Sequence, residues 1–423
     1  MVVPVRFQRL DAQRVALESA FCLHLRCLRA ELGARFERVT VAAPTMAPAD
    51  YLRDQAHLGT LDEQADGIRW VALQPGAAGR VAFWLRHAPS VARRLWRAVR
   101  AADFVHAGTS HDVYRPIEFL ALLFARLQAR RSQCVVDIDL RGEARMRRQT
   151  GRLGLRSYLL CRALYEPLRA LQLRLAVRWC GLVLLKGRRL CADYGRGRPH
   201  VKYILEAAFS PEHLLTPAAE TQRALELADP ERDLELIYFG RLVPYKGVDR
   251  CLEAVRAAVR AGAARVRFTI LGGGPEAARL QELARAAGSA VRIEFEPPLP
   301  FGPALFARLA RAHLLLAAPL SEDTPRSALD AMAAGLPVLA FATEYYTSLA
   351  ESGAVELVPW PSVEALAERI AWFEADKRRL APLSRAAVQF ARANTQEHWM
   401  RRRVRWTLAL FEAPPLALAE VRR

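Results

Sequence analysis

The chain has 423 residues, of which 52% are hydrophobic, and this is enough for two α/β domains with separate cores. Its 62 Lys and Arg residues outnumber its 44 Asp and Glu residues, which gives a formal net charge of +18 and favours anionic partners. No apolar run reaches the roughly 18 residues of a membrane-spanning helix, and the first residues do not resemble a signal peptide. Seven cysteines without a C-x-x-C pair argue against a disulfide framework or a zinc site, so we expect a cytoplasmic protein.

The first half of the chain alternates short apolar runs with helical patterns. A long helix is predicted at 11–32, and further helices follow several of the apolar runs. Strands are predicted at 2–7, 38–42, 67–73, 104–107, 134–138 and 181–185. Strand, helix and strand in repetition predict a parallel sheet with helices on both of its faces.

Residues 141–178 form the most basic segment, with ten arginines against two glutamates. Leucines at 160, 164, 168, 171 and 175 predict one apolar helical face. Such a helix can lie on an anionic membrane surface, with its leucines partly buried and its arginines on lipid phosphates. The alternative is a helix that packs on the sheet through its leucines and exposes its arginines to solvent. Nucleic acid is not an expected partner, because aromatic residues are not interleaved with the arginines.

The second half begins after 216–233, a proline-containing stretch that we predict to be a linker. It separates an N-terminal domain at 1–215 from a C-terminal domain at 234–395, and a last helix is predicted at 396–412. Strands of the C-terminal domain are predicted at 234–239, 266–271, 291–295, 313–317, 337–341 and 354–358.

Two strand–glycine–helix units open the second domain. The apolar run 234–239 is closed by Gly240, and the turn before the next helix carries Arg241 and Lys246. The run 266–271 is followed by G-G-G-P-E at 272–276. Two such units predict half of a doubly wound sheet, which binds ligands at the carboxyl ends of its strands. Free N–H groups and the helix dipole make this edge suitable for anions.

A third segment, 321–340, contains two acidic residues. Glu322 lies in the loop before a predicted helix and Asp330 lies within that helix, with seven residues between them. Thr324 is predicted to cap this helix. Carboxylates at the edge of a phosphate-binding site suit the recognition of sugar hydroxyls, because they accept hydrogen bonds.

Together the three segments resemble the GT-B glycosyltransferases of family 4, which are retaining enzymes that use nucleotide sugars. The G-R-L-x-x-x-K-G pattern is present at 240–247, the G-x-G-P-E turn at 272–276, and the E-x7-E signature as Glu322 and Asp330. The resemblance covers about residues 234–345. It implies two Rossmann-like domains that face each other across a cleft, with the C-terminal helix crossing back to the first domain.

The resemblance also implies roles for individual residues. Arg241 and Lys246 would bind the diphosphate of the donor, Glu322 the transferred sugar, and Asp330 the ribose, where relatives usually have Glu. Arg241, Lys246 and Glu322 are the catalytic candidates. The remaining donor-binding candidates are Gly240, Gly273, Gly274, Thr324 and Arg326. The donor would be a UDP- or GDP-sugar, and no metal is expected to be required.

The acceptor side departs from the family pattern. Relatives carry a Gly-Gly loop after the first strand, whereas this chain has Gln8–Asp11, in which Arg9 is a candidate phosphate contact and a solvated loop is the alternative. Asp139 stands where relatives have a histidine near the reacting sugar. His111 is a further candidate, because it follows a strand end, where binding residues collect.

The predicted function is transfer of a hexose from a nucleotide sugar to a glycan or lipid-linked acceptor, with retention. By family analogy, we expect a role in bacterial surface polysaccharide synthesis, such as lipopolysaccharide, at the inner face of the cytoplasmic membrane. Two alternatives remain at this point: a nucleotide-sugar epimerase of the same fold, and a catalytically degenerate basic subunit that binds surfaces.

Overall fold

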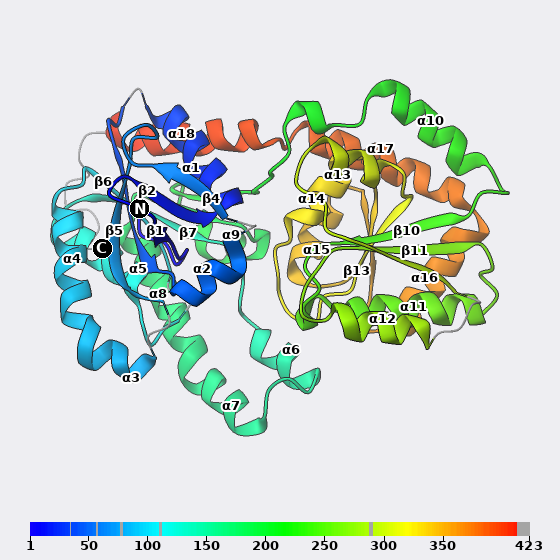
Figure 1. Cartoon of the computed structure of the whole chain (residues 1–423), viewed down its shortest axis with the longest axis horizontal. Helices are drawn as coiled ribbons and strands as arrows, with labels where there is room; N and C mark the ends of the chain where they lie inside the picture. The colour runs from blue at the N-terminus through cyan, green and yellow to red at the C-terminus, as the bar shows by residue number, and fades with distance from the viewer. Residues whose placement is uncertain (34, 56–57, 77–78, 110–111, 287–290, 413–423) are drawn as a thin grey trace.

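The computed structural model describes residues 1–412 except 34, 56–57, 77–78, 110–111 and 287–290. The chain forms two α/β halves that lie side by side, the first drawn in blue to green and the second in green to orange (Figure 1). Each half is built on a parallel sheet. This arrangement confirms the predicted fold class of two Rossmann-like halves.

The N-terminal sheet combines two groups of strands. The first group is β6 Phe104–Gly108, β7 Arg131–Val136, β8 Leu182–Leu185 and β9 Val201–Tyr203, in that order, and the second is β3 Val39–Thr45 with β5 Ile68–Pro75. Val2 connects the groups, because it bridges Ala42 of β3 and its N–H donates to the carbonyl of His106 in β6 at 2.8 Å. The strand predicted at 2–7 is therefore limited to bridges at Val2 and Phe7.

The helices of this half are mostly short. The α-helices are α1 Ser19–Leu32, α2 Pro48–Asp54, α3 Arg80–Ala82, α4 Ala88–Arg100, α5 Ile117–Leu127, α6 Glu143–Gln149, α7 Leu155–Leu160, α8 Glu166–Trp179 and α9 Arg188–Gly195. The π-helices η2 Phe83–His87 and η3 Cys161–Tyr165 lead directly into α4 and α8.

The helix predicted at 11–32 is wrong over its first part. Strand β2, Arg14–Glu18, pairs antiparallel with β1 Gln8–Arg9 and with β4 Leu58–Asp62, and α1 begins only at Ser19. Val15, Ala16 and Leu17 are all buried, so their apolar run fits a strand as well as a helix. These residues form a strand because they pair with β4, forty or more residues further along the chain.

The C-terminal sheet has the strand order β12-β11-β10-β13-β14-β15, and all of its pairs are parallel. The chain reverses its direction of winding between β10 and β13, which is where open sheets of this kind bind ligands. The strands are β10 Leu234–Phe239, β11 Val266–Leu271, β12 Arg292–Glu296, β13 Leu314–Ala317, β14 Val338–Phe341 and β15 Val355–Val358. The first two coincide with the predicted ranges.

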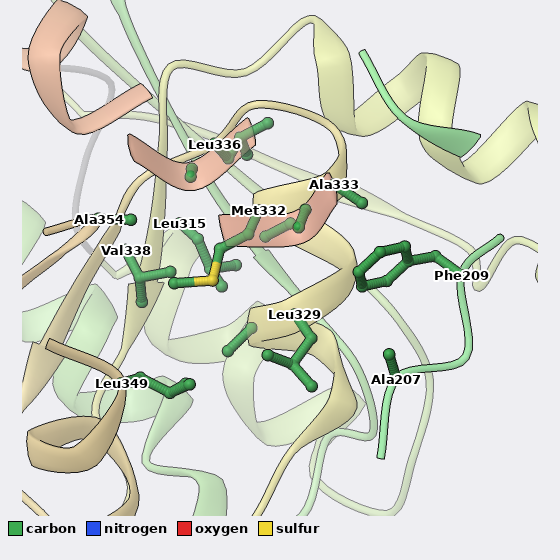
Figure 2. Close-up of a cluster of buried hydrophobic side chains, with 14 of the residues drawn as sticks. Ala207, Phe209, Leu315, Leu329, Met332, Ala333, Leu336, Val338, Leu349 and Ala354 are labelled. Atoms are coloured by element: carbon green, nitrogen blue, oxygen red, sulfur yellow. The ribbon is translucent and has the colours of Figure 1, made fainter. Parts of the chain in front are cut away.

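Two hydrophobic clusters cover the two faces of this sheet. Successive residues of β10 alternate between them: Leu236 and Tyr238 belong to one cluster, and Ile237 and Phe239 to the other. The helices are α10 Pro217–Ala228, α11 Val248–Arg260, α12 Ala277–Arg285, α13 Pro303–Ala310, α14 Arg326–Ala333, α15 Glu344–Ala350, α16 Val363–Ala375, α17 Leu380–Arg392 and α18 Gln396–Glu412, with 3-10 turns η4 Pro211–His213, η5 Pro244–Lys246 and η6 Lys377–Arg379. Figure 2 shows the cluster around α14, where Leu329 and Met332 meet Leu315, Val338 and Phe209.

The range 216–233, predicted as a linker, is mostly helical. Pro217 stands in the first turn of α10, and the Thr216 side chain caps it by accepting a hydrogen bond from Ala219 N–H at 3.3 Å. The buried Arg223 donates to the carbonyls of Ala312 at 2.8 Å and Ala310 at 2.7 Å. This segment therefore packs on the C-terminal half, and the proline that suggested a linker begins a helix.

Helix α18 crosses back onto the N-terminal half, as predicted (red in Figure 1). Its Met400 and Val404 pack against Leu28 of α1. Its Thr407 hydroxyl donates to Gln133 of β7 at 2.9 Å. These contacts join the end of the described chain to the first domain.

Candidate active site

Backbone contacts between glycines fix the loops after β10 and β11. Gly272 approaches Gly240 so closely that a Cβ at 272 would stand 2.0 Å from the Gly240 carbonyl oxygen, and a Cβ at Gly274 would stand 2.4 Å from that of Leu242. The Leu242 N–H donates to the Gly273 carbonyl at 2.8 Å. Only glycine permits this approach, so the G-G-G turn supports the loop that carries Arg241.

The turn η5 brings Lys246 to the same edge. Gly247 has a φ of 64°, and a Cβ there would meet the Ala318 carbonyl oxygen at 1.9 Å. The Lys246 ammonium forms an ion pair with Asp323, in the loop after β13. Arg241 is exposed, and its guanidinium donates to the Tyr245 hydroxyl at 3.2 Å. Both cations therefore lie at the point where the sheet reverses its winding, as the motif predicts.

Glu322 lies in the loop between β13 and α14. Its Oε1 accepts a hydrogen bond from the Glu344 N–H at 3.2 Å. Burial raises the pKa of Glu322 to about 7, and the carboxylates of Asp139 and Glu143, from the other half of the molecule, add to this rise. Glu322 therefore faces the N-terminal half and titrates near neutral pH.

Asp330 is held inside α14, where Ala328, Leu329 and Ala331 are also buried. Its Oδ1 is buried and has no hydrogen-bond partner. Burial raises the pKa of Asp330 to about 7, although the charge of Arg326 opposes the rise. A buried carboxylate oxygen without a partner costs free energy, so a ligand that donates a hydrogen bond to it would be favoured.

The predicted cap of α14 is wrong. The N-cap residue is Pro325 and no side chain caps the helix, whereas the Thr324 N–H donates to Asp323 Oδ1 at 2.9 Å. Pro325 has an extended conformation with φ −69° and ψ 129°, so the N-cap lies one residue past Thr324 and the helix starts at Arg326. Arg326 is exposed at the first helical position.

Asp139 is brought toward Glu322, although the two lie far apart in the sequence. Its carboxylate accepts hydrogen bonds from the Arg141 guanidinium at 2.6 to 3.0 Å and from the Arg141 N–H at 3.0 Å. The same guanidinium donates to Asp193 at 2.5 Å. Asp139 is therefore a buried carboxylate that is paired with Arg141.

Arg9, the other acceptor-side candidate, lies in the small antiparallel sheet. Its guanidinium pairs with Glu63 at 2.8 Å and donates to the Ala12 carbonyl at 3.2 Å. The Arg9 side chain therefore binds neighbouring groups of this small sheet and its loops. His111 falls outside the described residues.

Sequence reasoning missed several charged groups. Asp323, the partner of Lys246, follows Glu322 directly in S-E-D and could have been considered. Lys186, at the end of β8, pairs with Asp137 at 3.1 Å and with Glu206. No local motif links Lys186, Asp137 and Glu206, because three different segments of the chain supply them.

The basic segment 141–178 is broken into α6, α7, η3 and α8. The residues of α8 that pack inward include Gln172, Leu173, Ala176 and Val177. Three of the five predicted face leucines, Leu160, Leu164 and Leu171, are instead 55%, 41% and 48% exposed. The predicted apolar face therefore points largely to solvent and does not pack on the sheet.

One hydrogen bond and two ion pairs join the two halves near these loops. The Arg152 guanidinium, from the loop between α6 and α7, donates to the Pro244 carbonyl of η5. Arg188 pairs with Glu351 at 2.9 Å, and Arg189 with Glu344 at 3.6 Å. The loop that carries Arg241 and Lys246 and the two ends of α15 thus meet the N-terminal half. Among the described residues, no cluster of three His, Cys, Asp or Glu side chains is suited to hold a metal ion.

The chain is similar to known glycosyltransferases. Residues 221–392 match the family described as Glycosyl transferases group 1. A structure of Anabaena Alr3699/HepE in complex with UDP has a TM-score of 0.62 and 16% identity, over 91% of this chain and 95% of that chain. Sucrose-phosphate synthase from Thermosynechococcus elongatus has a TM-score of 0.60 and 17% identity, over 93% and 94%. WaaG, a glycosyltransferase involved in lipopolysaccharide biosynthesis, has a TM-score of 0.58 and 13% identity, over 92% and 95%. No curated protein matches the sequence.

The fold is that of the GT-B glycosyltransferases, and residues 221–392, somewhat less than half of the chain, match the Glycosyl transferases group 1 family. The predicted enzyme class is therefore confirmed, and family 4 membership and retention stay predictions.

Proposed function

We propose that the protein transfers a hexose from a UDP-sugar to a hydroxyl group of a glycan or lipid-linked acceptor, with retention of configuration. The observation that carries this proposal is the arrangement at the switch point of the second sheet. There, two cations precede α11 and a buried, unpartnered Asp330 carboxylate lies in α14. Alr3699/HepE has been solved with UDP and with UDP-glucose, which favours uridine over guanosine as the nucleoside of the donor.

Each donor-side residue has a role in this proposal. Arg241 and Lys246 bind the diphosphate, with Lys246 exchanging Asp323 for the ligand, and Asp330 accepts hydrogen bonds from the ribose. The uncapped start of α14, with Thr324 and Arg326, adds partial positive charge toward the phosphates. Gly240, Gly273 and Gly274 allow the backbone to come close to the donor.

The reaction breaks the bond between the anomeric carbon and the diphosphate oxygen and forms a glycosidic bond to the acceptor oxygen. Negative charge develops on the leaving diphosphate, and Arg241 with Lys246 stabilises it. The proton of the acceptor hydroxyl passes to the departing phosphate. Because the two cations and the helix terminus supply the positive charge, we propose that a divalent metal is not required.

The proposal is tested by incubating the protein with UDP-glucose and octyl β-glucoside as a probe acceptor. We expect release of UDP, and a new glycoside with the α configuration of the donor by proton NMR. A β-configured product would contradict retention. Epimerised donor with no glycoside would favour the epimerase alternative.

Substitution of Glu322 should separate sugar recognition from nucleotide binding. Loss of a charged hydrogen bond to the transferred sugar lowers kcat/KM roughly 10- to 100-fold in Glu322→Gln. Because its pKa is raised to about 7, we expect kcat/KM of the wild type to rise between pH 6 and pH 8 as the carboxylate forms, and this rise to disappear in the variant. The Kd of UDP, which has no sugar to contact, should stay unchanged in both proteins. An equal loss of UDP affinity would place Glu322 at the nucleotide instead.

The acceptor side of the proposal includes a membrane surface. Residues 141–178 combine exposed leucines with arginines, and no helix of the described chain has the length and apolarity to cross a bilayer. We propose that the protein works at the inner face of the cytoplasmic membrane, in the synthesis of a surface polysaccharide. A nucleic acid is not a proposed partner.

Replacing Leu159 and Leu164 by glutamate is expected to weaken binding to vesicles of phosphatidylcholine with phosphatidylglycerol. These leucines are 55% and 41% exposed, so they would lose apolar burial and bring negative charge to an anionic surface. Co-sedimentation with the vesicles measures the effect. The control is Leu225→Glu on α10, which is 63% exposed on the other half and should bind like the wild type. Equal binding of all three proteins would exclude this surface.

A further inference from the structure

A cavity of about 410 Å³ lies in the N-terminal half, between the end of β7 and the helices α6, α7 and α8. Most of its lining is apolar or aromatic, including Val136, Ile138, Leu153, Leu173, Tyr114 and Tyr165. None of these residues is used by the donor site. The cavity is therefore a separate, mainly apolar space on the acceptor side.

One end of the cavity lies toward the reacting sugar. Asp139, Glu143 and Leu153 line it, and Arg152, the residue before Leu153, donates to the Pro244 carbonyl in the loop that carries Arg241 and Lys246. A molecule in the cavity would thus have one end near the position where the donor sugar is transferred. This is the geometry of an acceptor and not of a distant effector.

The other end opens on an apolar surface. Leu160 lines the cavity and is 55% exposed, and its neighbours Leu155 and Leu159 are exposed to a similar extent. Trp84 is also exposed, and its indole N–H donates at 2.8 Å to the carbonyl of Tyr114, which lines the cavity. Helices α3 and α7 project from the same end of the N-terminal half (Figure 1). Exposed apolar side chains therefore lie next to the cavity.

Arginines surround this apolar space. Arg80 lies over the ring of Tyr114 at 4.5 Å and is 3.5 Å from Asp112. Arg147 has Glu143 at 3.9 Å, a weak ion pair between side chains that are 48% and 27% exposed. These two guanidinium groups lie where they can bind an anion attached to an apolar chain.

We infer that the cavity binds the acceptor as an amphiphile: the hydrocarbon chain fills the apolar space, a phosphate binds Arg80 and Arg147, and the sugar end reaches Asp139. This inference rests on the proposed function and narrows its acceptor from a glycan or lipid-linked sugar to a lipid-linked phosphate. If the acceptor were a soluble glycan, the apolar lining and the exposed leucines would stay in contact with water, which costs free energy.

The test is calorimetric titration with hexyl, octyl and decyl phosphate, each below its critical micelle concentration. Each added methylene that is buried should tighten binding about fourfold. Ala170→Phe, which places a phenyl ring in the cavity, should abolish this dependence on chain length. Ala224→Phe, the same change on the exposed face of α10, is the control and should behave like the wild type. Affinity independent of chain length, or equal in Ala170→Phe and wild type, would overturn the inference.

Two further arms keep the outcome interpretable. Thermal unfolding without ligand shows whether Ala170→Phe is folded, and Leu173→Trp offers a second way to fill the cavity if it is not. Decyltrimethylammonium replaces the phosphate by a cation and should bind at least tenfold more weakly than decyl phosphate; equal binding would overturn the assignment of an anionic group. UDP binding by the wild type reports on the donor site alone. Binding that depends on alkyl chain length, without UDP binding, would support the amphiphile site and reject the proposed transferase. UDP binding without any dependence on chain length would support the transferase and reject the amphiphile site.

Discussion

Replacing Arg241 and Lys246 together by alanine is expected to abolish the stabilisation of the protein by UDP. Each cation would bind a phosphate oxygen, and a hydrogen bond to a charged group contributes about 1.5–3 kcal/mol, so the Kd of UDP should rise roughly 10²- to 10⁴-fold. A ligand at 100 times its Kd stabilises the native state by about 2.7 kcal/mol, which a thermal shift readily detects. We expect a clear shift for the wild type and none for the double variant at the same concentration.

The matched control is Arg260→Ala with Arg311→Ala. These exposed arginines lie at the end of α11 and just after α13, so the control changes the net charge equally without touching the loops. It should keep the full shift. A shift retained by the Arg241 and Lys246 variant would place the nucleotide elsewhere. If UDP, GDP and ADP all failed to shift the wild type, the degenerate basic subunit would become the preferred function.

Asp330→Asn is expected to make the unliganded protein more stable and its binding of UDP weaker. The folded-state pKa of Asp330 is raised to about 7, so the group retains its proton in the folded state at pH values where the unfolded chain has lost it. Its contribution to stability is therefore present below the unfolded pKa and is lost as pH rises through the folded pKa. At pH 8 the wild type holds a buried charge that the asparagine lacks.

The size of this effect depends on pH. The difference between the usual pKa and about 7 corresponds to at most about 4 kcal/mol, so Asp330→Asn should unfold at a higher temperature than wild type at pH 8 and at nearly the same temperature at pH 4. Its UDP affinity should be lower than that of wild type at pH 8, because the carboxylate accepts more hydrogen bonds from the ribose than an amide does. Thermal unfolding and UDP titration at both pH values measure the two effects. Higher stability with unchanged UDP affinity would remove Asp330 from the donor site.

The strands and helix that carry the proposed donor residues could be predicted from the sequence in detail. Strands β10 and β11 coincide with their predicted ranges, and α11 begins at Val248, directly after the predicted Lys246-Gly247 turn. These features are local, because one strand, one glycine turn and one helix form a continuous segment. Gly272 lies so close to Gly240, and Gly247 so close to Ala318, that no other residue fits at these positions. These short motifs therefore specify the same loop structure even where the rest of the sequence differs.

Predictions failed where a distant segment decides the local structure. The strand Arg14–Glu18 forms because Leu58–Asp62 pairs with it, and α10 is stable because Arg223 reaches the carbonyls of Ala310 in α13 and of Ala312. In both places the local pattern is compatible with two structures. Backbone pairing and buried hydrogen bonds stabilise the structure that was not predicted.

By itself the sequence determined the class of protein and the position of the loops after β10 and β11 that we propose to bind the donor, since turn geometry and strand–helix spacing are encoded within a few neighbouring residues. Only the tertiary structure decided the acceptor side. Asp139, Leu160, Trp84 and Glu322 come from separate parts of the chain, and no spacing in the sequence relates them. The physical reason is that a loop is specified by its own backbone conformation, whereas a cavity exists only where several packed elements leave space between them.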